Sequence, residues 1–126
     1  MTSAPPVPAT RRAGRQGGGV GLRQLIAFIR LGRPVFLVGG FLLYGLGAAI
    51  AAWHGHAIDA TRYALGQATV TALQLMTHYA NDYFDLEADR VNTTPTAWSG
   101  GSRVLAGGEL PAAVALVTSL VLAALG

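Results

Sequence analysis

The feature that most constrains the fold is a stretch of twenty residues without any charge, Pro34–Trp53. A helix of this length spans about 30 Å, which is the thickness of the hydrocarbon core of a bilayer. Hydrophobic residues make up 52% of the 126-residue chain and charged residues only 12%, whereas a typical soluble domain has about 25% charged residues. The stretch therefore predicts a membrane-spanning helix rather than the core helix of a soluble domain.

Two further uncharged segments follow, at 63–80 and 110–126. Polar residues in and just after the first of them are spaced four and three apart: Gln67, Thr71, Gln74, His78, Asn81 and Asp85. This spacing places them on one face of a helix. Polar groups are costly in hydrocarbon, so that face is predicted to meet a bundle interior or a water-filled cavity. The predicted fold class is all-α, a multi-span transmembrane helix bundle.

The two ends of the chain differ from this apolar middle. Residues 1–20 contain three prolines, three arginines and a run of glycines, which predicts a disordered basic tail, with an organellar transit peptide as the alternative. Val20–Leu31 mixes apolar residues with arginine and predicts an amphipathic helix at the membrane surface. The last apolar segment is too short for a comfortable span. We therefore expect 21–126 to be the N-terminal part of a larger membrane domain, truncated at its C-terminus.

The distribution of charge and the cysteine content further narrow the class of protein to which the chain can belong. Six of the nine basic residues, all arginines, precede residue 34, and the first acid is Asp59. The positive-inside rule then predicts a multi-pass protein of the cell membrane whose N-terminus and 82–109 segment are cytoplasmic. The lipid bilayer is the expected partner of these arginines, and no nucleic-acid partner is expected. The absence of cysteine excludes disulfide scaffolds and thiolate sites.

Four of the six acids lie between Asp82 and Asp89. On a continuous helix Asp82, Asp85 and Asp89 occupy positions i, i+3 and i+7, so their carboxylates point the same way. Such neighbours raise one another's pKa unless a cation lies between them. A set of oxygen donors favours a hard ion, with Mg²⁺ ahead of Ca²⁺ or Mn²⁺. These three aspartates are therefore predicted to bind Mg²⁺; a solvated helix end with incidental acids is the alternative.

Residues on both sides of the acids extend this candidate site. Asn81 adds an amide, and His78 could orient a carboxylate or accept a proton, although a structural hydrogen bond would explain it equally well. The 98–103 segment WSGGSR offers paired glycines, two hydroxyls and an arginine, which suit a diphosphate. It is not a Walker loop, because the chain has no lysine. Glu87 is predicted to point away into solvent and to pair with Arg90.

The pattern N-D-x-x-D-x-x-x-D over residues 81–89 resembles the first aspartate-rich motif of the UbiA superfamily of intramembrane aromatic prenyltransferases. The strings HYA at 78–80 and WSGGSRVL at 98–105 are most similar to the 1,4-dihydroxy-2-naphthoate polyprenyltransferase branch. The Arg-Pro pair at 33–34 also fits the family's entry into its first helix. The resemblance covers roughly residues 22–126, and its specific part is the motif region.

This resemblance implies a bundle of nine membrane helices, of which the chain would supply the first three. It implies Mg²⁺-dependent transfer of a polyprenyl group from a prenyl diphosphate to an aromatic quinone precursor. The expected acceptor is 1,4-dihydroxy-2-naphthoate, in menaquinone biosynthesis, with 4-hydroxybenzoate or homogentisate as alternatives. The family's second aspartate motif lies outside this chain, so we expect the chain alone to be inactive.

Together, residue chemistry and resemblance give one set of candidate residues. The catalytic candidates are Asp82, Asp85 and His78; the diphosphate-binding candidates are Asn81, Ser102 and Arg103; and the metal ligands are Asp82, Asp85 and Asp89. A non-catalytic channel or transporter segment is the second function class, because a polar stripe can also line an ion path. The aspartates beside a Gly-Ser-Arg loop favour the enzyme, since an ion path rarely needs an anion site of diphosphate size.

Overall fold

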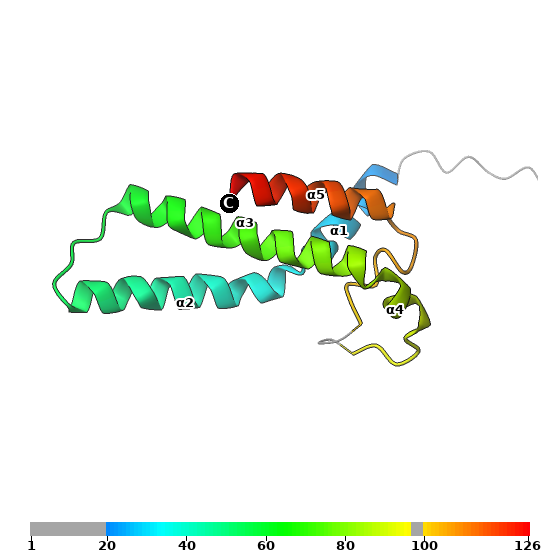
Figure 1. Ribbon diagram of the computed structural model, residues 1–126, viewed down its shortest axis with the longest axis horizontal. Helices are drawn as coiled ribbons and strands as arrows, with labels where there is room; N and C mark the ends of the chain where they lie inside the picture. The colour runs from blue at the N-terminus through cyan, green and yellow to red at the C-terminus, as the bar shows by residue number, and fades with distance from the viewer. Residues whose placement is uncertain (1–19, 97–99) are drawn as a thin grey trace, which may run out of the picture.

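The structure is a computed structural model that describes residues 20–96 and 100–126, and these form α-helices and no strand. The helices are α1 (Val20–Leu31), α2 (Pro34–Trp53), α3 (Ala60–Phe84), α4 (Leu86–Val91) and α5 (Ala112–Leu125). Helices α2 and α3 run side by side along the long axis, with α5 beside the second half of α3 (Figure 1). Helices α1 and α4 lie at the end where α3 finishes. The all-helical part of the predicted fold class is confirmed.

Helix α2 has the bounds that the sequence predicted. Pro34 is its first residue, a position where the N–H that proline lacks would have no partner within the helix. Within the described part of the chain, α2 is the one helix both long and apolar enough to cross a membrane. Only 6% of its most apolar window is buried against the rest of the chain. Its apolar surface is therefore available to lipid or to further protein.

Helix α3 extends beyond the predicted 63–80 segment at both ends. The Asp59 carboxylate caps its first turn by accepting a hydrogen bond of 2.8 Å from the backbone N–H of Arg62. The polar stripe of α3 turns toward α2: Gln67 is buried, and the Gln74 amide lies against α2. These polar residues lower the hydropathy of α3. Among the described helices α2 is therefore the single candidate span, and the multi-span bundle is not confirmed.

The close approach of α2 and α3 depends on glycines that the sequence reasoning did not select. A Cβ atom at Gly40 would lie 2.0 Å from the Gln74 Oε1 atom, and one at Gly66 would lie 1.8 Å from the Tyr44 Oη atom. A Cβ at Gly47 would meet nothing within 4 Å. The close approach of the two helices therefore depends on Gly40 and Gly66 and not on Gly47.

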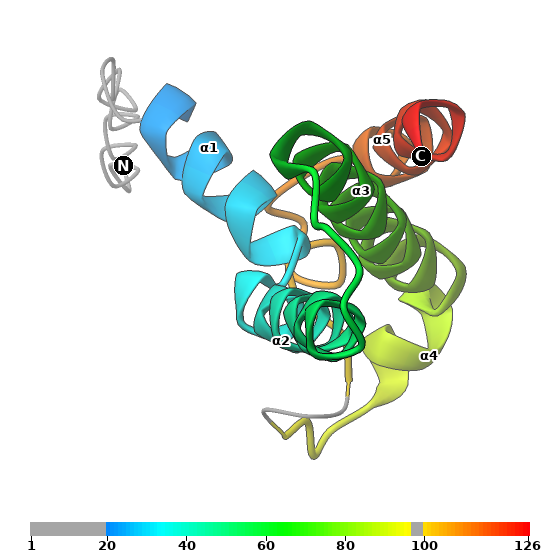
Figure 2. The same cartoon turned by 90° about the vertical axis from the view of Figure 1, so that its left-hand side faces the viewer.

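Helix α1 matches the amphipathic segment predicted from the sequence. It crosses the direction of the long helices: in Figure 2, α2 and α3 are seen end-on and α1 is seen lengthwise. Its outer face exposes four large apolar residues, Leu22, Leu25, Ile26 and Ile29. Its placement at a membrane surface stays a prediction. Of the predicted tail, residues 1–19 lie outside the described residues, and Val20 begins the helix.

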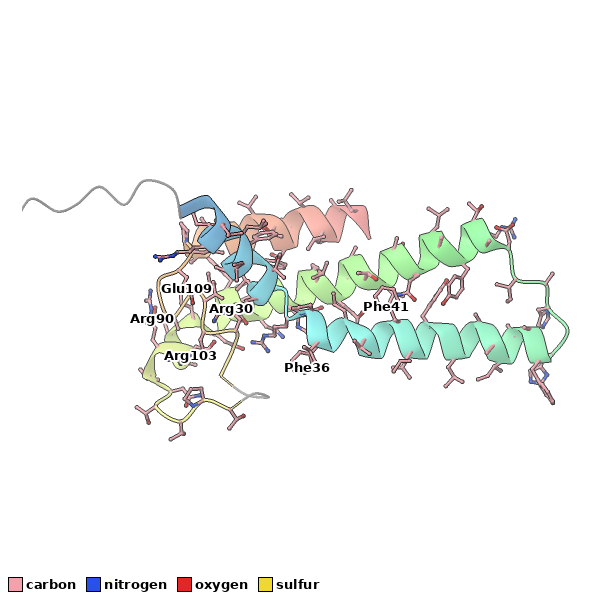
Figure 3. The ribbon with its side chains drawn as sticks, turned by 180° about the vertical axis from the view of Figure 1, so that it is seen from behind. Arg30, Phe36, Phe41, Arg90, Arg103 and Glu109 are labelled. Atoms are coloured by element: carbon pink, nitrogen blue, oxygen red, sulfur yellow. The ribbon has the colours of Figure 1, made fainter. Side chains whose placement is uncertain are left out.

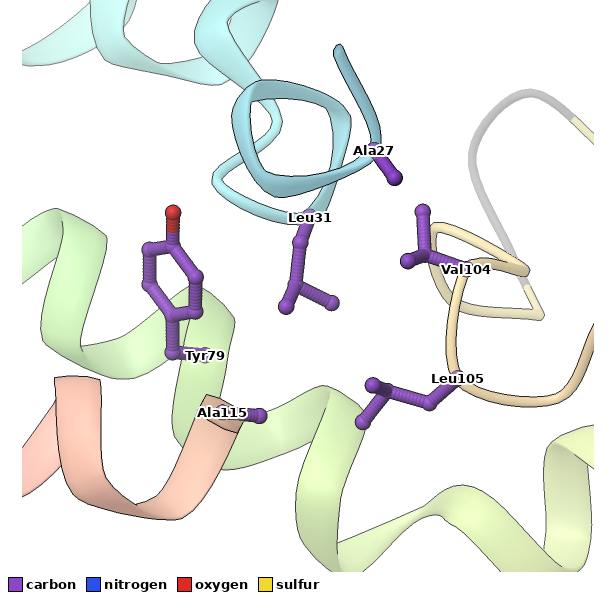
Figure 4. Close-up of a cluster of buried hydrophobic side chains, with 6 residues drawn as sticks. All are labelled: Ala27, Leu31, Tyr79, Val104, Leu105 and Ala115. Carbon is purple, nitrogen blue, oxygen red and sulfur yellow. The ribbon is translucent and has the colours of Figure 1, made fainter. Parts of the chain in front are cut away.

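The hydrophobic core lies under α1, between α3, α5 and the loop that precedes α5 (Figure 4). Its buried members are Ala27, Leu31, Tyr79, Val104, Leu105 and Ala115. The Tyr79 hydroxyl donates a hydrogen bond of 2.9 Å to the carbonyl oxygen of Phe28, and the two rings pack with centroids 5.2 Å apart. The core thus fixes the junction of α1 and α2 above the end of α3.

Replacing Leu31 by alanine is expected to lower the free energy of unfolding by about 2–4 kcal/mol, because it leaves a cavity in this core. Leu31 is 0% exposed, whereas Leu22 on the same helix is 66% exposed. The matched variant Leu22→Ala should therefore change stability by less than about 0.5 kcal/mol. Denaturant or thermal unfolding in detergent measures both. Equal losses in the two variants would contradict the position of the core.

Candidate functional site

Charged side chains gather at the end of the molecule where α3 meets α4. Arg30, Arg90, Arg103 and Glu109 all lie at this end, away from Phe41 in the middle of α2 (Figure 3). Within the described residues, the most deeply buried carboxylate is that of Asp82, which is 2% exposed and belongs to the last turn of α3. A charge so far from water needs direct partners, and the neighbouring segments supply them.

Both oxygens of the Asp82 carboxylate are hydrogen-bonded. The Oδ1 atom accepts from the Arg33 Nη2 at 2.6 Å. The Oδ2 atom accepts from the backbone N–H of Ser102 at 3.0 Å and also from the Ser102 hydroxyl. The Ser102 Oγ atom in turn accepts from the backbone N–H of Val104 at 3.2 Å. Asp82 therefore joins three segments through charge-assisted bonds. They are the α1–α2 junction, the end of α3 and the loop at residues 100–103, which we call the glycine loop.

Arg33 reaches Asp82 from an unusual backbone conformation. Its φ of 47° and ψ of 61° are left-handed, which costs a residue with a side chain about 1–2 kcal/mol. Gly32 precedes it at a tight position, where a Cβ atom would lie 3.0 Å from the Leu75 Cδ2. The Arg33 Nε atom is buried and has no hydrogen-bond partner within the described part of the chain. A strained backbone conformation of this kind persists only where the surrounding contacts hold the residue in place.

The sequence reasoning did not assign Arg33 to the site. One signal could have found it: Arg33 is the charged residue that directly precedes the uncharged α2 segment. A buried aspartate at the end of a neighbouring helix needs a cation at the same level. No spacing rule, however, connects two residues that are 49 positions apart.

The helix breaks within the aspartate motif. Asp85 has φ −88° and ψ 2° and separates α3 from α4. The predicted continuous helix through Asp82, Asp85 and Asp89 is therefore wrong. Asp82 and Asp89 are buried, whereas Asp85 is exposed.

Asp89 lies against the glycine loop and is 8% exposed. A Cβ atom at Gly101 would lie 1.9 Å from the Asp89 Oδ2 atom, so the loop backbone approaches the carboxylate as only glycine allows. Burial raises the pKa of Asp89, and the negative charges of Asp82 and Asp85 raise it further. The positive charges of Arg33 and Arg103 partly offset this effect. A bound cation would stabilise the ionised form of Asp89.

Arg103 holds the loop onto the end of α4. Its guanidinium donates to the backbone carbonyl of Asp89 and, at 3.4 Å, to that of Asn92. Basic side chains at the C-terminus of a helix stabilise its unpaired carbonyls in this way. Arg103 and Ser102, both predicted to bind diphosphate, are thus engaged in building the cluster in this conformation.

The remaining predicted residues lie around this cluster. Asn81 is exposed. The His78 ring packs against Phe36 with centroids 5.7 Å apart, and no hydrogen bond joins it to a carboxylate among the described residues. Glu87 pairs with Arg90 at 2.6 Å and is largely exposed, which confirms that prediction. The loop positions 98 and 99 lie outside the described residues.

Across residues 20–96 and 100–126, no three side chains from His, Cys, Asp and Glu converge as a metal site. The three-aspartate ligand set is not assembled in this conformation, because Asp82 is bonded to Arg33 and Ser102, and Asp85 is exposed. The donor chemistry nevertheless fits a hard cation. The available donors are oxygen atoms, and Asp89 is a buried carboxylate with a raised pKa.

Comparison of the chain with family models, curated proteins and solved structures gives no match. The resemblance to the UbiA superfamily therefore depends on the sequence motif at 81–89 and stays a prediction. The cluster contains five residues from three separate segments: Arg33, Asp82, Asp89, Ser102 and Arg103.

Asp89→Asn is expected to raise the melting temperature modestly at pH 7 in metal-free buffer. The pKa of Asp89 in the folded protein lies above its ordinary value of 3.8. The folded state therefore loses stability as the pH rises from about 3.8 through the raised pKa. At a pH of about 3.5 the Asp89 carboxyl is mostly protonated in both the folded and the unfolded protein. The gain in melting temperature from Asp89→Asn should therefore be smaller at that pH. Thermal unfolding at the two pH values measures this, and equal gains at both would contradict a charge effect.

Proposed function

We propose that the chain is part of a Mg²⁺-dependent intramembrane prenyltransferase of the UbiA type. The complete enzyme transfers a polyprenyl group from a prenyl diphosphate to an aromatic acceptor, 1,4-dihydroxy-2-naphthoate. One observation carries the proposal: two aspartates of the motif are buried against the glycine loop that also holds Ser102 and Arg103. An incidental acidic helix end would leave all of these carboxylates in solvent.

A membrane location is supported by how charge is distributed in the structure. The uncharged helix α2 begins directly after Arg33, so the polar cluster lies at one end of the candidate span. The labelled charged side chains gather at that same end (Figure 3). In the proposed cell membrane this end is cytoplasmic, because it joins the arginine-rich N-terminal segment. Helix α3 would then return across the bilayer with its polar stripe against α2.

In this proposal Asp82, Asp85 and Asp89 hold the ion. When bound, Mg²⁺ neutralises the negative charge that develops on the departing diphosphate. The 100–103 loop would orient the diphosphate through the positive charge of Arg103 and the backbone N–H groups of its two glycines. The low-dielectric cavity of the complete helix bundle would exclude water, which would otherwise capture the allylic cation.

The reaction itself breaks the carbon–oxygen bond to diphosphate and forms a carbon–carbon bond to the aromatic ring. The ring then returns to aromaticity by losing a group, which in the naphthoate is its carboxyl group as carbon dioxide. With an acceptor such as 4-hydroxybenzoate the ring loses a proton instead. His78, half-buried one turn before Asp82, is the proposed proton acceptor on this chain.

The test uses membranes that carry the complete enzyme, a labelled prenyl diphosphate and three acceptors supplied in turn. We expect Mg²⁺-dependent product with 1,4-dihydroxy-2-naphthoate; product with 4-hydroxybenzoate or homogentisate instead would reassign the acceptor. Asp85→Asn should reduce turnover by about 10- to 100-fold, a typical loss when residues of a metal site are changed. Asp85 is exposed, so this variant should still fold. The control is Glu87→Gln, an exposed acid two residues away. Equal turnover in both variants would remove the metal role.

A channel or transporter segment is less well supported. The polar stripe that would line an ion path packs against α2 instead, where Gln74 lies against Gly40. Gln67 and Thr71 also hydrogen-bond within α3: the Thr71 hydroxyl donates to the carbonyl oxygen of Gln67 at 2.8 Å. Absence of product with every acceptor, together with Mg²⁺-independent ion flux in vesicles, would favour this second class.

A further inference from the structure

We propose that Arg33 is the resident cation of the aspartate motif, and that Mg²⁺ must displace its guanidinium from Asp82 in order to bind. This inference deepens the proposed function and depends on it. In the absence of a divalent ion, Arg33 would stabilise the Asp82 charge that the ion takes over when it binds.

The hydrogen bonds of Asp82 identify which partner would leave. One of the two bonds from Ser102 is made by its backbone N–H, so that bond cannot break unless the loop moves. The bond from Arg33 comes from the end of a long side chain that is 22% exposed. Arg33 can therefore turn toward water while Asp82 and the loop keep their positions.

Electrostatics makes the two cations alternatives. The guanidinium lies 2.6 Å from the Asp82 Oδ1 atom, the distance of a direct ion pair. A divalent ion bonded to the same oxygen would lie within a few ångströms of this positive charge. Like charges that close repel strongly in a site with little water. A divalent ion bound to Oδ1 would therefore drive the guanidinium away from that oxygen.

The Arg33 side chain also leaves one of its own hydrogen-bond donors unpaired, and this favours its release from Asp82. Its Nε atom is buried without a hydrogen-bond partner among the described residues. An unpaired buried donor carries a desolvation cost. Release into water would recover that cost, so the ion pair is poised for exchange.

The decisive experiment measures Mn²⁺ binding, by electron paramagnetic resonance, to the full chain reconstituted in lipid nanodiscs. We expect R33Q to bind Mn²⁺ about tenfold more tightly than the wild type, because the competing positive charge is gone. The control is R30Q, which removes the exposed pair of Arg30 with Glu109 at 3.0 Å and should leave the affinity unchanged. Equal affinity in R33Q and the wild type overturns the inference and leaves the proposed metal site standing. No binding by any variant overturns both.

A second measurement needs no variant and so does not depend on the folding of R33Q. Phenylglyoxal modifies accessible arginines, and mass spectrometry locates the product. We expect Arg33 to be protected in the wild type without metal and to become at least about fivefold more reactive with saturating Mn²⁺, whereas exposed Arg30 should react equally in both. Unchanged protection of Arg33 under saturating Mn²⁺ would overturn the displacement.

Discussion

Gly101→Ala is expected to dislodge the Asp89 carboxylate and to lower the free energy of unfolding by about 2–4 kcal/mol, within the range for overpacked positions that also carry backbone strain. The new Cβ atom would lie 1.9 Å from the Asp89 Oδ2 and 2.9 Å from its Cγ, so the aspartate has to move. Asp89 is buried and its side chain is short, so it has little room in which to do so. The backbone adds strain, because Gly101 has φ +68°.

Gly108→Ala is the matched control for that experiment. Gly108 has φ +71°, which is nearly the same conformation, but a Cβ there would meet nothing within 4 Å. Its expected loss is the backbone cost alone, about 1 kcal/mol. Thermal unfolding of both variants separates the clash from the strain. In the complete enzyme, Gly101→Ala should also abolish Mg²⁺-dependent turnover. Equal behaviour of the two variants would contradict the close approach of the loop to Asp89.

Asp82→Ala is expected to have the largest effect on folding, a loss of about 3–5 kcal/mol. It leaves the Arg33 charge partly buried without its partner, and it leaves both donor groups of Ser102 unpaired. The double variant with Arg33→Met should recover part of that loss, because the orphaned charge is then removed. A coupling energy of about 1–3 kcal/mol between the two positions is the expected result. Unfolding of the wild type, the two single variants and the double variant gives this value, and strict additivity would contradict the buried ion pair.

Much of the helical architecture could be predicted from the sequence, because it follows from local rules. The uncharged run that starts at Pro34 and ends at Trp53 gave the bounds of α2. The spacing of apolar residues and arginines predicted α1. The three-residue spacing of Glu87 and Arg90 on a helix predicted their ion pair. Each of these features depends on residues that are close in sequence.

The parts that could not be predicted depend on distant contacts or on single backbone conformations. Periodicity assumes an unbroken helix, so it could not place the turn at Asp85 that separates Asp82 from Asp89. The left-handed conformation of Arg33 has no signal in residue type, because glycine is the residue that ordinarily adopts it. The reach of Gly101 toward Asp89 is likewise set by the path of the loop through space.

Whether these aspartates hold the metal and the diphosphate can be tested by equilibrium binding of a labelled prenyl diphosphate to the complete enzyme, measured with Mg²⁺ and with a chelator. We expect saturable binding that requires Mg²⁺ and weakens by about tenfold or more in Asp89→Asn, a variant that should be at least as stable as the wild type at pH 7. Binding of equal strength in the chelator, or unchanged binding in Asp89→Asn, would contradict the claim that these aspartates hold the metal and the diphosphate.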